Sequence, residues 1–252
     1  GGHSAGASYL ILAASLGGSS TFNLSDADYR FHGSSADDWA GYSLASAGDV
    51  DGDGLDDILI GAHGNEDGGP ETGAAYLILA SSLGDDSTIS LSDSDYIFVG
   101  DSDSMLAGYS IAGAGDVDGD GLDDILIGAP YDDEGGTDAG AAFLILASSL
   151  GSSTAINLSD SSYVFVGENE GAQSGCSVSS AGDVDGDGLD DLLVGAKGDG
   201  FTGAAYLVLS ASLAITSKIY LSAANTKFVG SQIGDVAGVS VTNAGDVDGD
   251  GL

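Results

Sequence analysis

Basic residues are scarce in this sequence of 252 residues, which has 4 Lys and Arg against 40 Asp and Glu and a formal net charge of −36 at pH 7. A surface this acidic repels the phosphates of nucleic acids and anionic lipid headgroups, and it attracts cations instead. The composition therefore argues against a nucleic-acid-binding protein.

Cysteine and long apolar runs are also scarce. Cys176 is the only cysteine, so no disulfide can form within the chain. No run of 18 apolar residues is present, which argues against a membrane-spanning helix. The first residues show neither an initiator Met nor the basic and apolar segments of a signal peptide. Because hydrophobic residues still make up 42% of the sequence, we expect a packed core and not disorder.

The acidic residues are unevenly chosen, with 35 Asp and 5 Glu. Asp suits turns and short metal-binding loops, whereas Glu would be expected if the acids simply covered helices. We therefore expect the negative charge to lie in loops.

An internal repeat organises the whole sequence. The string Ala-Gly-Asp-Val-Asp-Gly-Asp-Gly-Leu occurs four times at spacings of 67, 67 and 63 residues, and its first Asp is Asp49, Asp116, Asp183 or Asp246. A second marker, Gly-Ala-Ser/Ala-Tyr/Phe-Leu, begins at residues 6, 73, 140 and 203 with the same spacings. Two markers in one register establish a structural repeat.

Each repeat predicts four short strands. In the second complete unit we place them at residues 108–112, 125–129, 141–146 and 163–166, separated by stretches rich in Gly, Ser and Asp. The second of these strands is apolar without alternation, as expected for a strand buried on both faces, and no helical periodicity is present. The predicted fold class is all-β, a β-propeller of four-stranded blades.

The repeat boundaries predict a single propeller section over residues 1–252. Residues 1–32 would supply the third and fourth strands of one blade, and three blades follow at about 33–99, 100–166 and 167–229. Residues 230–252 would supply only a first strand and the opening of its loop. We expect the native polypeptide to continue past Leu252, because that residue lies inside a repeated motif.

The acidic strings predict calcium sites. In loop 1 (residues 49–57), carboxylates at positions 1, 3 and 5, the main-chain carbonyl at position 7 and the carboxylate at position 9 offer oxygen ligands, as Ca²⁺ prefers. Loop 2 (116–124) and loop 3 (183–191) repeat this pattern. The predicted ligands are Asp49, Asp51, Asp53, Leu55, Asp57, Asp116, Asp118, Asp120, Leu122, Asp124, Asp183, Asp185, Asp187, Leu189 and Asp191.

A fourth loop starts at Asp246, Asp248 and Asp250, and its closing ligand would lie beyond the sequence, so we expect weak binding or none there. The cofactor prediction is therefore Ca²⁺ in three complete loops and one truncated loop. The acids at position 8 (Asp56, Asp123, Asp190) are expected to point outward, the alternative being that they reach the ion through water.

Other metals and motifs fit less well. Zinc would require His or Cys, and Mg²⁺ usually takes fewer carboxylates. An EF-hand needs a bidentate Glu at position 12, where these loops have Ile60, Ile127 and Val194. The alternative that the Asp-Gly runs are only solvated turns is disfavoured, because so many neighbouring carboxylates repel one another without a cation.

The segment from residue 40 to residue 62, Ala-Gly-Tyr-Ser followed by loop 1 and Ile-Leu-Ile-Gly-Ala, resembles the FG-GAP repeats of integrin α-chain propellers and their bacterial relatives. The resemblance implies a seven-bladed propeller, of which this chain would supply about four blade equivalents, with calcium between the first two strands of a blade. It also implies an extracellular, secreted or cell-surface setting and a role in adhesion. The Phe-Gly pair is replaced by Ala-Gly at residues 40 and 107 and by Ser-Gly at residue 174.

Two sets of loops vary while the framework repeats, at residues 64–72, 131–138 and 198–202 and at residues 34–39, 101–106 and 168–173. Such loops predict recognition of an unknown protein or glycan ligand. Trp39 is either a ligand anchor or a packing residue, and Cys176 is interpreted as a small buried thiol. The alternative function is the propeller domain of a secreted hydrolase or lyase, although no catalytic residues are predicted. Further predicted partners are the missing blades of the same chain or a second copy of it.

Overall fold

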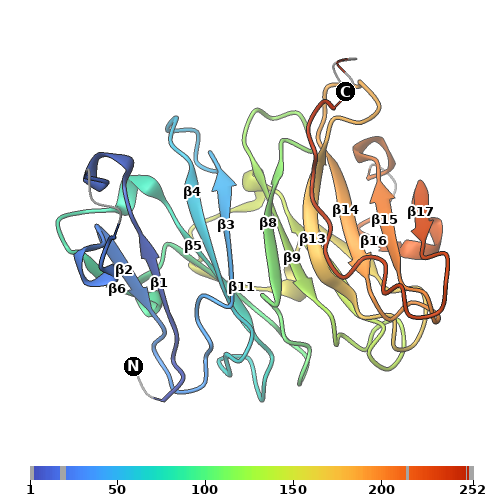
Figure 1. Cartoon of the computed structure of the whole chain (residues 1–252), viewed down its shortest axis with the longest axis horizontal. Helices are drawn as coiled ribbons and strands as arrows, with labels where there is room; N and C mark the ends of the chain where they lie inside the picture. Colours follow the sequence, from blue (N-terminus) through green and yellow to red (C-terminus); the bar gives the residue numbers. More distant parts are fainter. Residues whose placement is uncertain (1–2, 18–20, 214–215, 248, 250–252) are drawn as a thin grey trace.

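The computed structural model describes residues 3–17, 21–213, 216–247 and 249, and these residues form four β-sheets that stand in a row in chain order (Figure 1). Within each sheet, consecutive strands run antiparallel from the innermost strand outward, as in the blades of a β-propeller. The innermost strands of neighbouring sheets contact one another, so the sheets pack face to face. The all-β propeller architecture predicted from the repeat is confirmed.

The first sheet holds β1 (Ala7–Leu10), β2 (Tyr29–His32) and β6 (Thr88–Ser90). The second sheet, blade 1, orders its strands β3 (Ser43–Gly48), β4 (Asp57–Ala62), β5 (Ala74–Ile78), β7 (Tyr96–Val99) and β11 (Ala155–Asn157). Blade 2 orders them β8 (Ser110–Gly115), β9 (Asp124–Ala129), β10 (Ala141–Ile145), β12 (Tyr163–Val166) and β16 (Lys218–Tyr220). Blade 3 orders them β13 (Ser174–Gly182), β14 (Asp191–Ala196), β15 (Ala204–Val208) and β17 (Thr226–Val229).

Eight single-turn 3₁₀ helices are the helical elements of the described residues. Those that follow each third strand are η1 (Ala13–Ser15), η3 (Ala80–Ser82), η5 (Ala147–Ser149) and η7 (Ser210–Ser212). Those that precede each fourth strand are η2 (Leu24–Asp26), η4 (Leu91–Asp93), η6 (Leu158–Asp160) and η8 (Leu221–Ala223). Among the described residues, no helix is both long and apolar enough to cross a membrane.

Several bounds of the predicted strands are corrected. In blade 2 the first strand is Ser110–Gly115 and not 108–112. The second begins at Asp124, one residue before its predicted start, and the third ends at Ile145, one residue before its predicted end. The expected first strand after residue 238 is absent from the described part of that segment. In blades 1 to 3 this strand pairs with a second strand that follows the acidic loop.

An additional outermost strand joins three of the sheets, and the sequence did not predict it. Strands β6, β11 and β16 pair in parallel with the outermost strand of the preceding sheet, as in the register of Ile156 with Phe98. Each has only three residues, too few for an alternating pattern, and its partner lies in the neighbouring repeat. These strands connect consecutive blades at their outer edge.

The core lies between the blades. One cluster of buried residues, which includes Leu59, Phe98 and Ile127, is shared by blades 1 and 2, and a second, which includes Phe165 and Val194, is shared by blades 2 and 3. The middle strands β4 and β9 are buried along nearly their whole length, because each is covered on both faces. The strand ends are therefore held firmly, which positions the loops.

Candidate functional site

Loops 1, 2 and 3 connect the first and second strands of their blades at the same end of the molecule, along the upper edge in Figure 1. A shift of strand register just before each loop turns the chain out of the sheet, between Ser46 and Gly48 in blade 1. The same shift occurs before loops 2 and 3. The predicted acids are thus presented by a tight hairpin on a rigid strand pair.

Each loop is folded around its own carboxylates. In loop 1, the Asp49 side chain accepts hydrogen bonds from the amides of Gly52 (2.8 Å) and Gly54 (3.0 Å). The side chain of Asp51 accepts from the Asp53 amide at 3.1 Å, and Asp53 accepts from the amide of position 7 at 2.8 Å. Loops 2 and 3 repeat these bonds. Local turn chemistry therefore fixes the loop shape.

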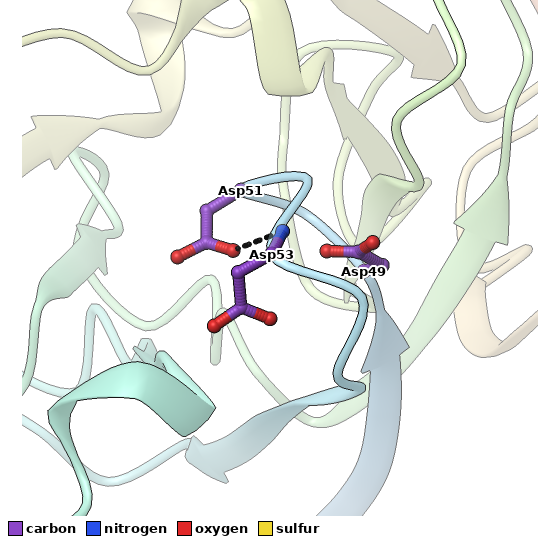
Figure 2. A group of neighbouring side chains, drawn as sticks. All are labelled: Asp49, Asp51 and Asp53. Carbon is purple, nitrogen blue, oxygen red and sulfur yellow. Dashed lines mark hydrogen bonds between the residues drawn. The ribbon is translucent and has the colours of Figure 1, made fainter.

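The carboxylates converge in each complete loop. Figure 2 shows the three acids of loop 1 gathered around one space, and one oxygen from each lies within 4.8 Å of the others. In loops 2 and 3 the groups that meet this distance use position 9 in place of position 5. The three groups are Asp49, Asp51 and Asp53; Asp116, Asp118 and Asp124; and Asp183, Asp185 and Asp191.

The acid at position 9 is buried, and both of its carboxylate oxygens accept hydrogen bonds from main-chain amides. Asp124 is 0% exposed, and its two oxygens accept from the amides of Val117 (3.0 Å) and Ala147 (2.8 Å). Burial raises the pKa of Asp124 to about 7, against the lowering effect of these two hydrogen bonds. Burial also raises the pKa of Asp57 and Asp191, which accept equivalent bonds.

The expectation that position 8 points outward is wrong in loops 2 and 3, whereas Asp56 of loop 1 is exposed. The carboxylate of Asp123 instead accepts a hydrogen bond from the amide of Asp49 in the preceding blade at 2.8 Å, and Asp190 accepts from Asp116 at 3.0 Å. Among the described residues, Asp56 bonds within its own blade alone, to the Ser46 hydroxyl at 3.5 Å. The bond between Asp123 and Asp49 could not be predicted from the sequence, because the two residues lie 74 positions apart.

The fourth loop is described only in part. Asp246 accepts a hydrogen bond from the Gly249 amide at 2.6 Å, as in the complete loops. The predicted ligands Asp248 and Asp250 lie outside the described residues.

The donor set fits a hard divalent cation. All predicted ligand atoms are oxygens, several carboxylates converge in each loop, and no His or Cys is present in any of the loops. Ca²⁺ takes six to eight such oxygens in flexible geometry. The leucines at position 7 would contribute through their carbonyl groups, while their amides are engaged within the loop.

The opposite end of the blades carries both sets of variable loops, along the lower edge in Figure 1. Here main-chain bonds join neighbouring blades: the amide of Leu106 donates to the carbonyl of Glu71 at 3.2 Å, and that of Gln173 donates to Asp138 at 3.0 Å. The equivalent residues Trp39, Leu106, Gln173 and Val236 all have φ between 53° and 56°. The backbone at this end is therefore as regular as at the loop 1–3 end.

A buried polar position at this end differs among the blades. In blade 3, Asp199 is 5% exposed and accepts from the Tyr206 hydroxyl (2.9 Å) and from the Lys227 ammonium (2.7 Å). Burial opposes ionisation of Asp199, but its hydrogen bonds, those from Lys227 foremost, hold its pKa below the usual range. In blade 1 the equivalent Asn65 donates to the Tyr76 hydroxyl at 3.1 Å.

Blade 2 lacks both partners. Its equivalent acid, Asp132, is 6% exposed, while Phe143 and Val164 stand where blade 3 has a tyrosine and a lysine. A cavity of about 530 Å³ opens beside it, lined also by Asp101 and by Glu134, which forms an ion pair with Lys218 at the cavity wall. Burial raises the pKa of Asp132, and the neighbouring acids add to this effect. Sequence comparison of the repeats could have revealed this difference.

Aromatic rings gather near the innermost strands at the same end. The Tyr42 and His63 rings meet edge to face at 4.2 Å, Tyr109 lies 5.1 Å from Tyr42, and Lys197 lies 5.5 Å above Tyr109. Trp39, 6.3 Å from His63, is 51% exposed and hence not a buried packing residue. Burial lowers the pKa of His63.

Cys176 occupies the position of these tyrosines in blade 3. It is 6% exposed, and its sulfur lies 3.4 Å from the carbonyl oxygen of Gly238. Burial raises the pKa of its thiol, so the group is a poor nucleophile.

Comparison with known proteins places these repeats in a family. The FG-GAP repeat matches residues 40–78, 107–145 and 177–208, and each match spans one complete acidic loop. The chain is 36% identical to "Integrin alpha-5" of Xenopus laevis over 205 residues, covering 76% of this chain and 18% of that protein. It is 32% identical to "Integrin alpha pat-2" of Caenorhabditis elegans over 235 residues, covering 85% of this chain and 17% of that protein. It is 37% identical to human "Integrin alpha-7" over 160 residues, covering 63% of this chain and 12% of that protein. The chain thus spans less than a fifth of the length of these relatives.

Proposed function

This chain belongs to the FG-GAP repeat family, and from that premise we propose that it is a calcium-binding propeller section of an extracellular or cell-surface protein that mediates adhesion or recognition. The observation that carries the calcium assignment is the convergence of carboxylate oxygens in three loops. The loops are prefolded by their own amides, so binding requires little rearrangement.

Calcium would act through stability. A cation that binds only the folded state adds about 2.7 kcal/mol for each site when its concentration is 100 times Kd. We expect EGTA to lower the Tm of the chain and added Ca²⁺ to restore it, with Mg²⁺ much less effective.

The matched control replaces the acid at position 3 of every complete loop, as in D51N, D118N and D185N combined. An asparagine oxygen still accepts the hydrogen bond from the position 5 amide, so the loop turn is kept while the charge is lost. This variant should melt at the same temperature with and without EGTA. An EGTA-insensitive melt of the unaltered chain would contradict the assignment.

The variable loops would carry recognition, because they combine exposed side chains with a backbone fixed between blades. The cavity beside Asp132 suits a basic group of a protein ligand, since Asp101, Asp132 and Asp133 line it and the lysine that also lines it, Lys218, is paired with Glu134. The same end presents the half-exposed Trp39 ring as an apolar contact.

Binding to immobilised matrix proteins and to a glycan array tests this role. The double variant F143Y/V164K would place the blade 3 partners in the cavity, and we expect it to weaken binding while leaving calcium affinity unchanged. The proposal assigns no catalysis to the chain. Hydrolysis or elimination that is lost in D132N or E134Q would favour the secreted hydrolase or lyase instead.

A further inference from the structure

Neighbouring acidic loops contact each other through a reciprocal pair of hydrogen bonds. The carboxylate of Asp123, at position 8 of loop 2, accepts from the amide of Asp49 at 2.8 Å. The amide of Asp123 donates back to the Asp49 carbonyl at 3.1 Å. Asp49 is the position 1 acid of loop 1, so a predicted ligand of one loop is held by the next loop.

The same contact joins loops 2 and 3. Asp190 accepts from the amide of Asp116 at 3.0 Å and donates to its carbonyl at 3.0 Å. The leucine at position 7 of loop 2 also lies close to loop 1, since the Leu122 side chain is 3.0 Å from the place that a Cβ on Gly52 would occupy. In loops 2 and 3, the closing half of the loop is therefore held against the opening half of the loop before it.

Position 8 lies between two predicted ligand positions of its own loop. Any ion held by the carbonyl at position 7 and the carboxylate at position 9 fixes the intervening residue, and with it the bonds to the preceding loop. Ordering this shared segment costs conformational entropy. Once an ion in one loop has ordered it, an ion in the other loop binds without that cost. The carboxylate at position 8 also lies between the two loops, where its negative charge would offset repulsion between cations bound in both.

We propose that calcium binding is positively coupled from blade to blade, and that Asp123 and Asp190 transmit the coupling. This inference rests on the proposed calcium function and adds to it that the three sites do not fill independently. Coupling between sites is reciprocal, so occupancy of loop 2 must strengthen binding in loop 1 by the same factor as the reverse.

Calcium titration followed by the amide resonances of Gly54, Gly121 and Gly188 reports each loop separately by NMR. Disabling loop 2 with D118N keeps the turn bond and should weaken calcium binding in loop 1 about fivefold or more, within the usual range of coupling. Disabling loop 1 with D51N should weaken loop 2 by the same factor.

A second pair of variants tests whether the bond between Asp123 and the Asp49 amide carries the coupling between loops 1 and 2. D123A removes the acceptor for the Asp49 amide and should abolish the coupling between loops 1 and 2, whereas D123N keeps an acceptor oxygen and should retain most of it. The matched control is D56A, which removes the same acid at the same loop position where it bonds to no other blade. D56A should leave coupling intact.

Three results would overturn the inference. Unchanged affinity of loop 1 in D118N would show that the loops bind independently, and coupling that survives D123A would assign it to another contact. Equal loss in D56A would attribute the effect to charge alone. The proposed function fails in a different way, because then no glycine resonance would respond to calcium in the unaltered chain.

Discussion

The two ends of the blades are built on equally regular backbones, yet only one end keeps its side chains from repeat to repeat. At the loop 1–3 end, the carboxylates themselves make the turns, so changing a side chain changes the fold of the loop. At the opposite end, main-chain bonds between blades set the loop path, and residues as different as Trp39 and Gln173 share one conformation. Side chains can therefore vary where the backbone does not depend on them.

The largest effect that distinguishes the two ends is expected for G115A. Gly115 has φ +77°, and an added Cβ would lie 2.1 Å from the Asp190 carboxylate, so strain and a steric clash combine. We expect a loss of about 2 to 4 kcal/mol in the free energy of unfolding, measured by urea denaturation. The control G121A has φ +88° but open space around its Cβ, and it should lose about half as much in EGTA. Equal losses would show that the contact between blades adds nothing.

The pH dependence of calcium binding tests the buried acids at position 9. Because burial raises the pKa of Asp124 to about 7, the calcium-free chain gains stability from protonating this group, and that gain is lost as pH rises from about 4 through 7. Calcium and the proton compete for the carboxylate, so affinity should rise up to about tenfold per pH unit over this range. Titrations at pH 5, 6 and 7 measure this rise. D124N should flatten it for loop 2, and a pH-independent affinity would contradict the burial argument.

A smaller effect is expected for K227M at the opposite end. The change leaves the buried Asp199 without its cation, but the lysine side chain is 33% exposed, which screens the interaction. We expect a loss of about 1 to 2 kcal/mol in the free energy of unfolding, with no change in calcium affinity. V164M, at the equivalent position of blade 2, should lower the free energy of unfolding by less, because no cation is lost there. A similar loss in both variants would assign the effect to packing.

The smallest effect is expected for W39A. Because the Trp39 ring is half-exposed, its removal should change the unfolding free energy by no more than about 0.5 kcal/mol while weakening ligand binding. Thermal melting and binding to the immobilised ligand measure the two effects. A large loss of stability would show that this end of the blades also depends on its side chains.

Much of the fold could be predicted from the sequence, because the same pattern recurs in every repeat. The apolar second and third strands and the acidic string recur in register, and the structure forms strands over those segments. The short parallel strands such as β11 were not predictable, because three residues carry no period and their pairing depends on the next blade. The first strand of blade 2 starts later than predicted, since Gly108 bonds across to Gly128 before the regular ladder begins.

Part of the candidate site could likewise be predicted from local sequence, and part depends on contacts with other strands and blades. Turn chemistry within nine residues brings together Asp49, Asp51 and Asp53, and spacing alone could predict it. The role of Asp123 was misjudged, because the amide it binds belongs to the preceding blade. The cavity at Asp132 depends on two residues from other strands, Phe143 and Val164.

The sequence by itself determined the repeat, the all-β blades and an oxygen-only donor set in each acidic loop, because these follow from local hydrogen bonding and from the spacing of apolar residues. Only the tertiary structure decided that Asp124 is buried between two main-chain amides, that position 8 joins neighbouring loops, and that blade 2 has a cavity where Tyr206 and Lys227 contact the buried acid of blade 3. The contact at position 8 arises from the packing of one blade on the next, which brings together residues 74 apart in the sequence. The burial of Asp124 and the cavity arise within one blade, from groups on different strands and loops that no local sequence pattern brings together.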